Sequence, residues 1–206
     1  WVMLEGLRYP TWDADYHIKP MTGWIAGPKY TLAGVDFGWD HPSAILIYGV
    51  DKGGNRRYVM DEWKKRKVSQ EELILVCQEF YEKYNLDAII CDSADPRWIN
   101  AMQWEFGGKL PVRTVKKDRS FGFTACLAAL TRKVEGEQAF FVSPECQKFK
   151  TEIENYIDSD SKFQSDDLMS CWRYLETEAL LHYGSLAPQM VMRSFKFSFS
   201  GGGDNG

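Results

Sequence analysis

The sequence predicts a single α/β domain in which helices cover a mixed β-sheet, and three observations support this fold class. Three strand patterns separated by short turns, at 30–36, 43–50 and 57–62, predict an antiparallel meander. An uninterrupted apolar run at 86–91 follows a helical pattern, which is typical of a buried parallel strand. The length of 206 residues fits one hydrophobic core better than two.

Composition places the chain among globular proteins and excludes several function classes. It is 44% hydrophobic and 26% charged, which excludes disordered and collagen-like proteins. No segment approaches the roughly 20 apolar residues that span a bilayer, so we expect no membrane partner. The net charge of −4 excludes coating of nucleic acid by bulk charge alone, although local basic patches can still bind it. Five cysteines without a CxxC pair predict reduced core thiols in a cytosolic protein.

The remaining elements follow from periodicity and turn residues. Residues 1–30 are rich in turn formers and aromatic residues, and we expect them to be a lead-in segment packed on the domain. Residues 70–84 predict an amphipathic helix with Ser69 as its N-cap. Further helices are expected at 98–106, 120–132, 144–156 and 166–183, and short strands at 112–115 and 139–142.

Beyond the last helix, residues 195–199 alternate like an edge strand, and 200–206 predict a flexible tail. We therefore expect the lead-in at 1–30, the folded domain at 31–185 and a C-terminal extension at 186–206. The order of strands and helices matches a ribonuclease H-like architecture: an antiparallel meander plus parallel strands, flanked by helices. This architecture alone says little about chemistry.

Acidic residues stand where strands end or a helix begins. Asp36 and Asp92 each end a strand pattern, and Asp166 and Asp167 open the last long helix. If the two strands are adjacent and parallel, both side chains project from the sheet edge where open α/β sheets bind ligands. Each acid taken alone is also typical of a turn, a cap or a favourable helix start, so only the joint pattern is informative.

Acids placed this close would repel one another unless a cation lay between them. Oxygen ligands favour a hard divalent ion, and a pair of Mg²⁺ or Mn²⁺ ions supports phosphodiester cleavage. Asp61 and Glu62, at the end of the third strand, are additional candidate ligands, whereas Asp95 is expected to cap a helix or support the site indirectly.

Three motifs carry a family resemblance. The stretch AGVDFGWDHPSA at 33–44 resembles the first nuclease motif of large terminase subunits, the DNA-packaging motors of tailed phages. The stretch ICDSADP at 90–96 is similar to their second acidic motif, and SDDLMSCWRY at 165–174 is similar to the third. The segment EGLRYP at 5–10 resembles the connection from motor to nuclease, and VKKDRSFGF at 115–123 resembles a basic stretch after the second motif.

The resemblance implies a ribonuclease H-like, metal-dependent endonuclease that cuts double-stranded concatemeric viral DNA during genome packaging. Its two-metal site of Mg²⁺ or Mn²⁺ would be held by acids at four positions, Asp36, Asp92, Asp166 and Asp167. Implied partners are double-stranded DNA, a portal protein and a small terminase subunit, in the host cytoplasm.

Two departures from the family pattern stand out. Ser165 takes the place of a histidine that family members often carry, which puts any proton-shuttle role of that histidine in doubt here. No GxxxxGK[ST] phosphate loop occurs in the chain, so an ATPase domain is expected N-terminal to it in the full-length protein.

Basic clusters are the expected DNA contacts, and they would bind phosphates without reading the sequence of the bases. They comprise Lys64 and Lys65 after the third strand, and Lys116, Lys117 and Arg119 beside the expected active edge. Three tryptophans within apolar helical patterns are expected in the core rather than stacked on bases, namely Trp98, Trp104 and Trp172.

Other functions fit part of the same pattern. A junction resolvase or transposase of the same fold would use similar acids. An actin-like kinase fragment would explain the Gly34–Gly38 turn, but it requires a duplicated domain and threonine-rich phosphate contacts that the chain lacks. A noncatalytic module that docks on the portal or procapsid would use the acids for structure, and would show no Mn²⁺-dependent stabilisation.

Overall fold

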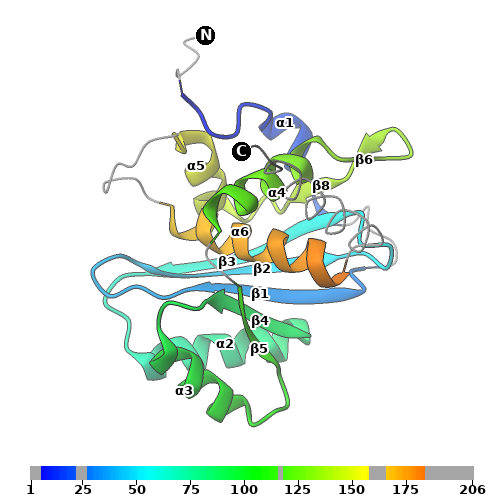
Figure 1. The fold of residues 1–206 in the computed structure, drawn as a ribbon. Coiled ribbons are helices and arrows are strands. Elements are labelled where there is room, and N and C mark those ends of the chain that lie inside the picture. Colours follow the sequence, from blue (N-terminus) through cyan, green and yellow to red (C-terminus); the bar gives the residue numbers. More distant parts are fainter. Residues whose placement is uncertain (1–5, 22–26, 116–117, 158–165, 184–206) are drawn as a thin grey trace, which may run out of the picture.

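The computed structural model describes residues 6–21, 27–115, 118–157 and 166–183. A six-stranded sheet lies between two layers of helices (Figure 1). In sheet order the strands are β5 (Val112–Val115), β4 (Ala88–Asp92), β1 (Tyr30–Asp36), β2 (Ser43–Val50), β3 (Arg57–Lys65) and β8 (Phe140–Val142). The mixed α/β fold class predicted from the sequence is confirmed.

Strand directions bring the ends of several strands to one edge. β1 pairs antiparallel with β2, and β2 pairs antiparallel with β3, as the meander prediction requires. β4 is parallel to β1, β5 is parallel to β4, and β8 is parallel to β3. Only β2 among these six therefore runs against the others, so β1, β3 and β4 finish at the same edge of the sheet.

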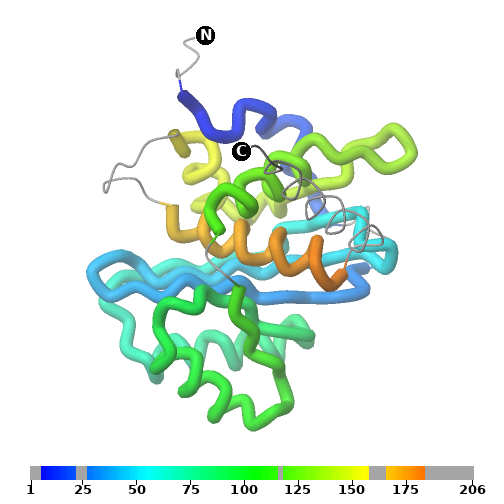
Figure 2. Tube along the Cα trace, in the orientation of Figure 1, coloured from blue at the N-terminus to red at the C-terminus, as the bar shows by residue number. Residues whose placement is uncertain are grey.

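The sheet separates two hydrophobic cores where the chain length predicted one, because successive side chains of a strand point to opposite faces and helices cover both. Leu32 of β1 belongs to the core beneath α4 (Arg119–Thr131), α5 (Gln147–Asn155) and α6 (Asp167–Glu178). Its neighbour Ala33 belongs to the core formed with α2 (Gln70–Tyr84) and α3 (Pro96–Phe106). Figure 2 shows the two helix layers on opposite sides of the strands.

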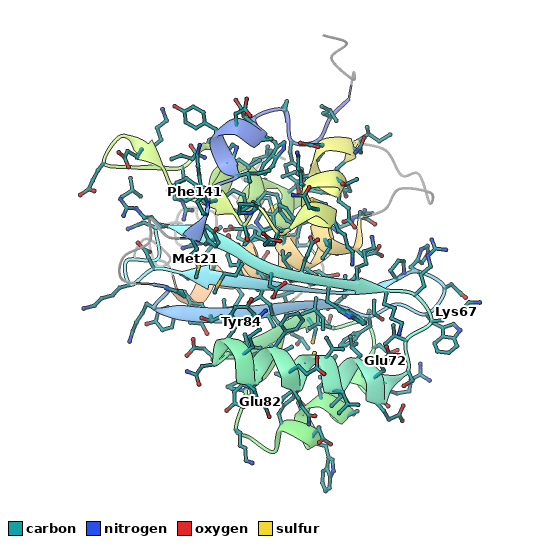
Figure 3. The ribbon with its side chains drawn as sticks, turned by 180° about the vertical axis from the view of Figure 1, so that it is seen from behind. Met21, Lys67, Glu72, Glu82, Tyr84 and Phe141 are labelled. Carbon is teal, nitrogen blue, oxygen red and sulfur yellow. The ribbon has the colours of Figure 1, made fainter. Side chains whose placement is uncertain are left out.

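α2 shows how local sequence signals fix an element. The helix begins after Ser69, whose hydroxyl accepts the backbone N–H of Glu72 at 3.2 Å, and ends at Asn85 in the left-handed conformation. Seen from behind in Figure 3, Tyr84 lies directly beneath the sheet whereas Glu82 lies away from it. The helix therefore has one face against the sheet and one in solvent, as its amphipathic pattern predicts.

α6 is the helix that the domain encloses most completely. Every residue from Asp167 to Glu178 is buried except Thr177. Glu176 forms an ion pair with Arg57, with Nε and Oε2 3.7 Å apart and both side chains fully buried, and it accepts a hydrogen bond from the hydroxyl of Tyr48. Burial, together with the charge of Glu176, raises the pKa of Tyr48, so its hydroxyl stays a donor.

Several elements differ from the sequence prediction. A short helix, α1 (Ala14–His17), and a hairpin of β6 (Lys133–Val134) and β7 (Glu137–Gln138) were not predicted, because such short segments give no periodicity. The last helix ends in a π-helical turn (Ala179–Tyr183) instead of a regular helix. The predicted edge strand at 195–199 and the tail at 200–206 lie outside the described residues.

The described part of the lead-in packs on the domain. Tyr9 is 2% exposed and stacks on Tyr156, and Leu7 forms a β-bridge with Ile157. The five cysteines are buried free thiols, as expected. Within the described ranges, no helix has both the length and the apolar character needed to cross a membrane.

The three tryptophans expected in the core occupy different environments. Trp172 is fully buried, and Trp98 is half-buried against Phe37, with ring centroids 5.3 Å apart. The prediction for Trp104 is wrong, because its side chain is 87% exposed. The buried positions of α3 are Ile99, Met102 and Phe106, and Trp104 lies on the opposite side of that helix.

The different burial of Trp172 and Trp104 predicts that replacing each side chain by alanine has an unequal effect on stability. Trp172→Ala should lower the free energy of unfolding by about 3–5 kcal/mol, because it opens a cavity in the core. Trp104→Ala should change it by less than about 0.5 kcal/mol, because the indole already contacts solvent. Urea unfolding followed by circular dichroism measures both. Equal losses in the two variants would contradict the packing of α3 and α6.

Candidate active site

A row of side chains crosses the sheet at the edge where β1, β3 and β4 end. Asp36 of β1 is paired with Ala44 of β2, which in turn is paired with Lys64 of β3. On the other side, Val35 is paired with Cys91, which places Asp92 beside Asp36. Paired residues of neighbouring strands point to the same face. Asp92, Asp36 and Lys64 therefore all point towards the layer that contains α6.

The loop after Asp36 is tightly folded. The Ser43 hydroxyl donates to the carbonyl oxygen of Gly38 at 2.9 Å, and the N–H of Gly38 lies 3.2 Å from the same hydroxyl oxygen. A Cβ at Gly38 would lie 2.5 Å from the carbonyl oxygen of His41, so the turn requires glycine. The tight loop thus fixes the backbone directly after Asp36, the last residue of β1.

α6 lies directly over β1 because Gly34 has no side chain. A Cβ at this position would lie 2.8 Å from the carbonyl oxygen of Cys171 and 2.8 Å from the side chain of Leu175. From this helix Tyr174 reaches the sheet edge, and its hydroxyl donates to Oδ1 of Asp36 at 3.1 Å. Burial, with the charges of Asp36 and Asp92, raises the pKa of Tyr174 far above its usual value, so this hydroxyl remains a donor.

The two acids at the start of α6 have different partners. Asp167 is 7% exposed, and its Oδ2 lies 2.6 Å from the ammonium of Lys64. Asp166 lies on the side of α4, where its Oδ2 is 3.8 Å from both Arg119 and Arg173. Asp167 therefore joins the row at the sheet edge, and Asp166 belongs to a cluster of arginines beside it.

The buried Cys171 lies in the contact between α6 and the sheet, where its Sγ is 3.5 Å from the carbonyl oxygen of Ala44. Burial raises the pKa of the thiol, and the charges of Asp36, Glu152 and Asp167 add to this effect. The sequence predicted acids at two strand ends and at the helix start, and the structure brings Asp36, Asp92 and Asp167 to one edge.

Glu152 is a buried acid of this site that sequence reasoning missed. It is 6% exposed, and it bonds to the ammonium of Lys64. Burial raises the pKa of Glu152 to about 7, although the ion pair with Lys64 opposes this rise. A signal existed in the sequence, because Glu152 lies on the same face of α5 as the buried Phe149 and Ile153.

Lys64 occupies a different environment from the one expected for a DNA contact. Its side chain is 12% exposed, because the strand register points it towards α6 rather than towards solvent. Burial lowers the pKa of Lys64, but its hydrogen bonds to Asp167 and Glu152 outweigh this and raise it overall, so the ammonium stays charged. Lys64 therefore supplies a fixed positive charge among the acids.

The other candidate residues are distributed around the edge. Asp61 bonds to Lys83 and Tyr84 on the opposite face of the sheet. Glu62 points to the same face as Lys64, but its carboxylate accepts two backbone N–H groups of α5. Asp95 caps α3, as expected.

The other predicted DNA contacts are basic residues near this edge. The side chain of Lys65 is 56% exposed and pairs with Glu72, and that of Arg119 is 53% exposed. Lys116 and Lys117 lie outside the described residues.

The donor chemistry of this edge suits a hard divalent ion. Asp36, Asp92 and Asp167 offer carboxylate oxygens, the ligands that Mg²⁺ and Mn²⁺ prefer. Within the described ranges, no three acidic, histidine or cysteine groups are already close enough together to hold an ion. Asp167 instead contacts the ammonium of Lys64, which partly offsets the repulsion among the acids.

Comparison with known proteins places these residues in a family context. A family model described as the terminase RNaseH-like domain matches residues 33–175, a range that includes Asp36, Asp92 and Asp167. The large terminase subunit of Escherichia phage T5 is 24% identical over 159 residues, which are 75% of this chain and 35% of that protein.

Solved structures show the same fold. The large terminase of a thermophilic bacteriophage, solved in complex with ATP-gamma-S, matches with a TM-score of 0.70 at 19% identity, over 86% of this chain and 46% of that one. The nuclease domain of the g2p large terminase from bacteriophage SPP1, solved with bound Mn, matches with a TM-score of 0.53 at 25% identity, over 71% of this chain and 84% of that one. The ribonuclease H-like fold is thereby confirmed. The chain spans about a third of the T5 protein and about half of the thermophilic-phage protein.

The close contact of α6 with β1 leads to a prediction about Gly34. Gly34→Ala should lower the free energy of unfolding by about 1–3 kcal/mol, because the added methyl group must push back the backbone of α6. Gly53→Ala is the control, since the nearest atom to its Cβ would be the end of the flexible Asn55 side chain at 3.0 Å, and Asp51 would be in ordinary contact at 3.9 Å. Chemical denaturation measures both variants. Unchanged stability in Gly34→Ala would contradict the close packing of the helix on the strand.

Proposed function

Because this chain belongs to the terminase RNaseH-like domain family, we propose that it is a metal-dependent endonuclease that cuts double-stranded concatemeric DNA during viral genome packaging. The observation that carries the proposal is the placement of Asp36, Asp92 and Asp167 at one edge of the sheet. The bound Mn in the SPP1 nuclease domain, a protein of the same fold, supports a divalent metal requirement.

Asp36, Asp92 and Asp167 would hold the metal. Bound Mg²⁺ or Mn²⁺ ions, as a pair, supply activation of a water molecule and stabilisation of the leaving oxygen in phosphodiester hydrolysis. The first two carboxylates belong to strands in the middle of the sheet, so the fold fixes their positions. The hydroxyl of Tyr174 orients Asp36, and the ion pair with Lys64 directs Asp167 to the edge.

DNA would approach along the exposed cations around this edge. Arg119 and Arg173 line a pocket between α4 and α6 that also includes Tyr174, the residue bonded to Asp36. Arg119 and Lys65 would contact phosphates, as would Lys116 and Lys117 in the segment outside the described residues. Because phosphate contacts release counterions, binding should weaken steeply with salt and depend little on base sequence.

We further propose that the chain works as one part of a large terminase. Its match to about a third of the T5 protein and about half of the thermophilic-phage protein supports an ATPase domain elsewhere in the full-length protein. The thermophilic-phage structure contains ATP-gamma-S, which supports a nucleotide site in that type of protein. A portal protein and a small terminase subunit would be its partners, and assembly would take place in the host cytoplasm.

Cleavage of supercoiled plasmid tests the nuclease. The purified chain should convert the plasmid to nicked and linear forms with Mn²⁺ or Mg²⁺ and not with EDTA. Asp36→Ala should lower the rate by at least about 100-fold, because a ligand of the proposed metal site is lost. Asp61→Asn, a change of carboxylate on the opposite face, is the control and should retain activity. A folded chain that neither cuts DNA nor gains thermal stability with Mn²⁺ would favour the noncatalytic docking module.

The two neighbouring acids of α6 should differ in importance. Asp167→Asn should abolish metal-dependent cleavage, because Asp167 faces the sheet edge. Asp166→Asn should retain most of it, because Asp166 faces Arg119 and Arg173. Plasmid cleavage rates and the Mn²⁺-dependent shift in melting temperature measure both variants side by side. Loss of activity in Asp166→Asn alone would reverse this assignment.

A further inference from the structure

The first turn of α6 lacks a cap from its own sequence. A helix starts with four N–H groups that have no partner within the helix, and the N-cap side chain usually accepts one of them. Asp166 occupies the N-cap position but makes no such hydrogen bond. The acceptor is Glu152 of α5, whose Oε2 lies 2.9 Å from the N–H of Leu168 and 3.2 Å from that of Met169. One helix thus caps another.

The second oxygen of the same carboxylate connects the helix start to the sheet. Oε1 of Glu152 accepts a hydrogen bond from the ammonium of Lys64, which also lies 2.6 Å from Oδ2 of Asp167. Lys64 stands two strands from Asp36 at the same level of the sheet, with Ala44 between them. The position of Asp167 relative to Asp36 is therefore set by two connections, one through helix backbone and one through Lys64.

All three side chains are enclosed. The side chains of Glu152, Asp167 and Lys64 are 5%, 10% and 12% exposed. A charged group in such surroundings is costly unless hydrogen bonds satisfy it, so the three groups favour one joint arrangement. Replacing the Glu152 carboxylate by an amide would weaken the acceptor of the Leu168 and Met169 N–H groups, and would leave Lys64 with one fewer carboxylate. Both changes loosen the residue that begins α6, which is Asp167.

We propose that Glu152 is a positioning residue of the metal site, which holds Asp167 at the sheet edge through the first turn of α6 and through Lys64. It contacts neither DNA nor metal in this role. The inference rests on the proposed function, since it assigns Asp167 as a metal ligand. It extends that function by adding a buried residue from α5, an element that supplies none of the proposed ligands.

The test is Mn²⁺ binding to the full chain without DNA, measured by isothermal titration calorimetry. Glu152→Gln preserves the length and one oxygen acceptor but removes the carboxylate that pairs with Lys64. We expect its Mn²⁺ affinity to fall about tenfold or more, the usual effect of losing a group that orients a ligand. Ser69→Ala is the matched control, because it also removes a helix cap, that of α2 on the opposite face, and should keep wild-type affinity.

Two further measurements separate positioning from a general loss of stability. In EDTA, the amides of Leu168 and Met169 should exchange hydrogen faster in Glu152→Gln than in the wild type, while the amide of Glu72 keeps its protection. In plasmid cleavage, kcat should fall while KM for DNA stays unchanged, and saturating Mn²⁺ should restore most of the lost kcat.

The outcomes distinguish this inference from the function on which it rests. If the wild type binds Mn²⁺ and Glu152→Gln binds it equally well, the positioning role is overturned and the nuclease proposal stands. If the folded wild type binds no Mn²⁺, both fall. If Ser69→Ala loses as much affinity as Glu152→Gln, the effect reflects stability alone, and the positioning role is again overturned.

Discussion

The contact between α6 and the sheet is the interaction on which the rest of the structure depends. The helix backbone can lie on β1 only because Gly34 leaves room for Cys171 and Leu175. Once it is there, α6 closes one hydrophobic core and carries Tyr174 to Asp36. At the other end of the helix, the buried pair of Glu176 and Arg57 ties it to β3. Such a pair is costly to desolvate and strongly disfavours any arrangement that separates its members.

Two carboxylate caps link β3 to α5 and α5 to α6. Glu62 of β3 accepts the amides of Lys148 and Phe149 in the first turn of α5. Glu152 of α5 then accepts two amides in the first turn of α6. Negative charge at a helix N-terminus is favourable, because the amide dipoles there point towards it. The order β3, α5, α6 thus locates each helix start relative to the strand that ends beside the candidate site.

Much of the fold and the proposed ligand positions follow from local signals in the sequence. Asp36 and Asp92 follow apolar strand patterns, and the rule that ligands gather at strand ends places them together. The meander and α2 are equally local, because turns, caps and periodicity define them. The distinction between Asp166 and Asp167 is not local, since adjacent residues at a helix start differ only in what the tertiary structure sets opposite them. The roles of three other residues depend on tertiary structure in the same way and could not be predicted. The pairing of β3 with β2 turns Lys64 inward, and α6 supplies the partners of Glu152. The sheet covers the side of α3 that faces away from Trp104.

The position of α6 along the chain has a consequence for biosynthesis. Asp36 and Asp92 emerge from the ribosome early, within the strands that form the centre of the sheet, whereas Asp167 arrives only with the last described α-helix. A nascent chain that has folded its sheet therefore still lacks the third acid, and a chain truncated before α6 never gains it. A nuclease of the proposed kind, built in this order, cannot cut DNA before α6 has been synthesised and has packed on the sheet, because α6 supplies one of its proposed ligands.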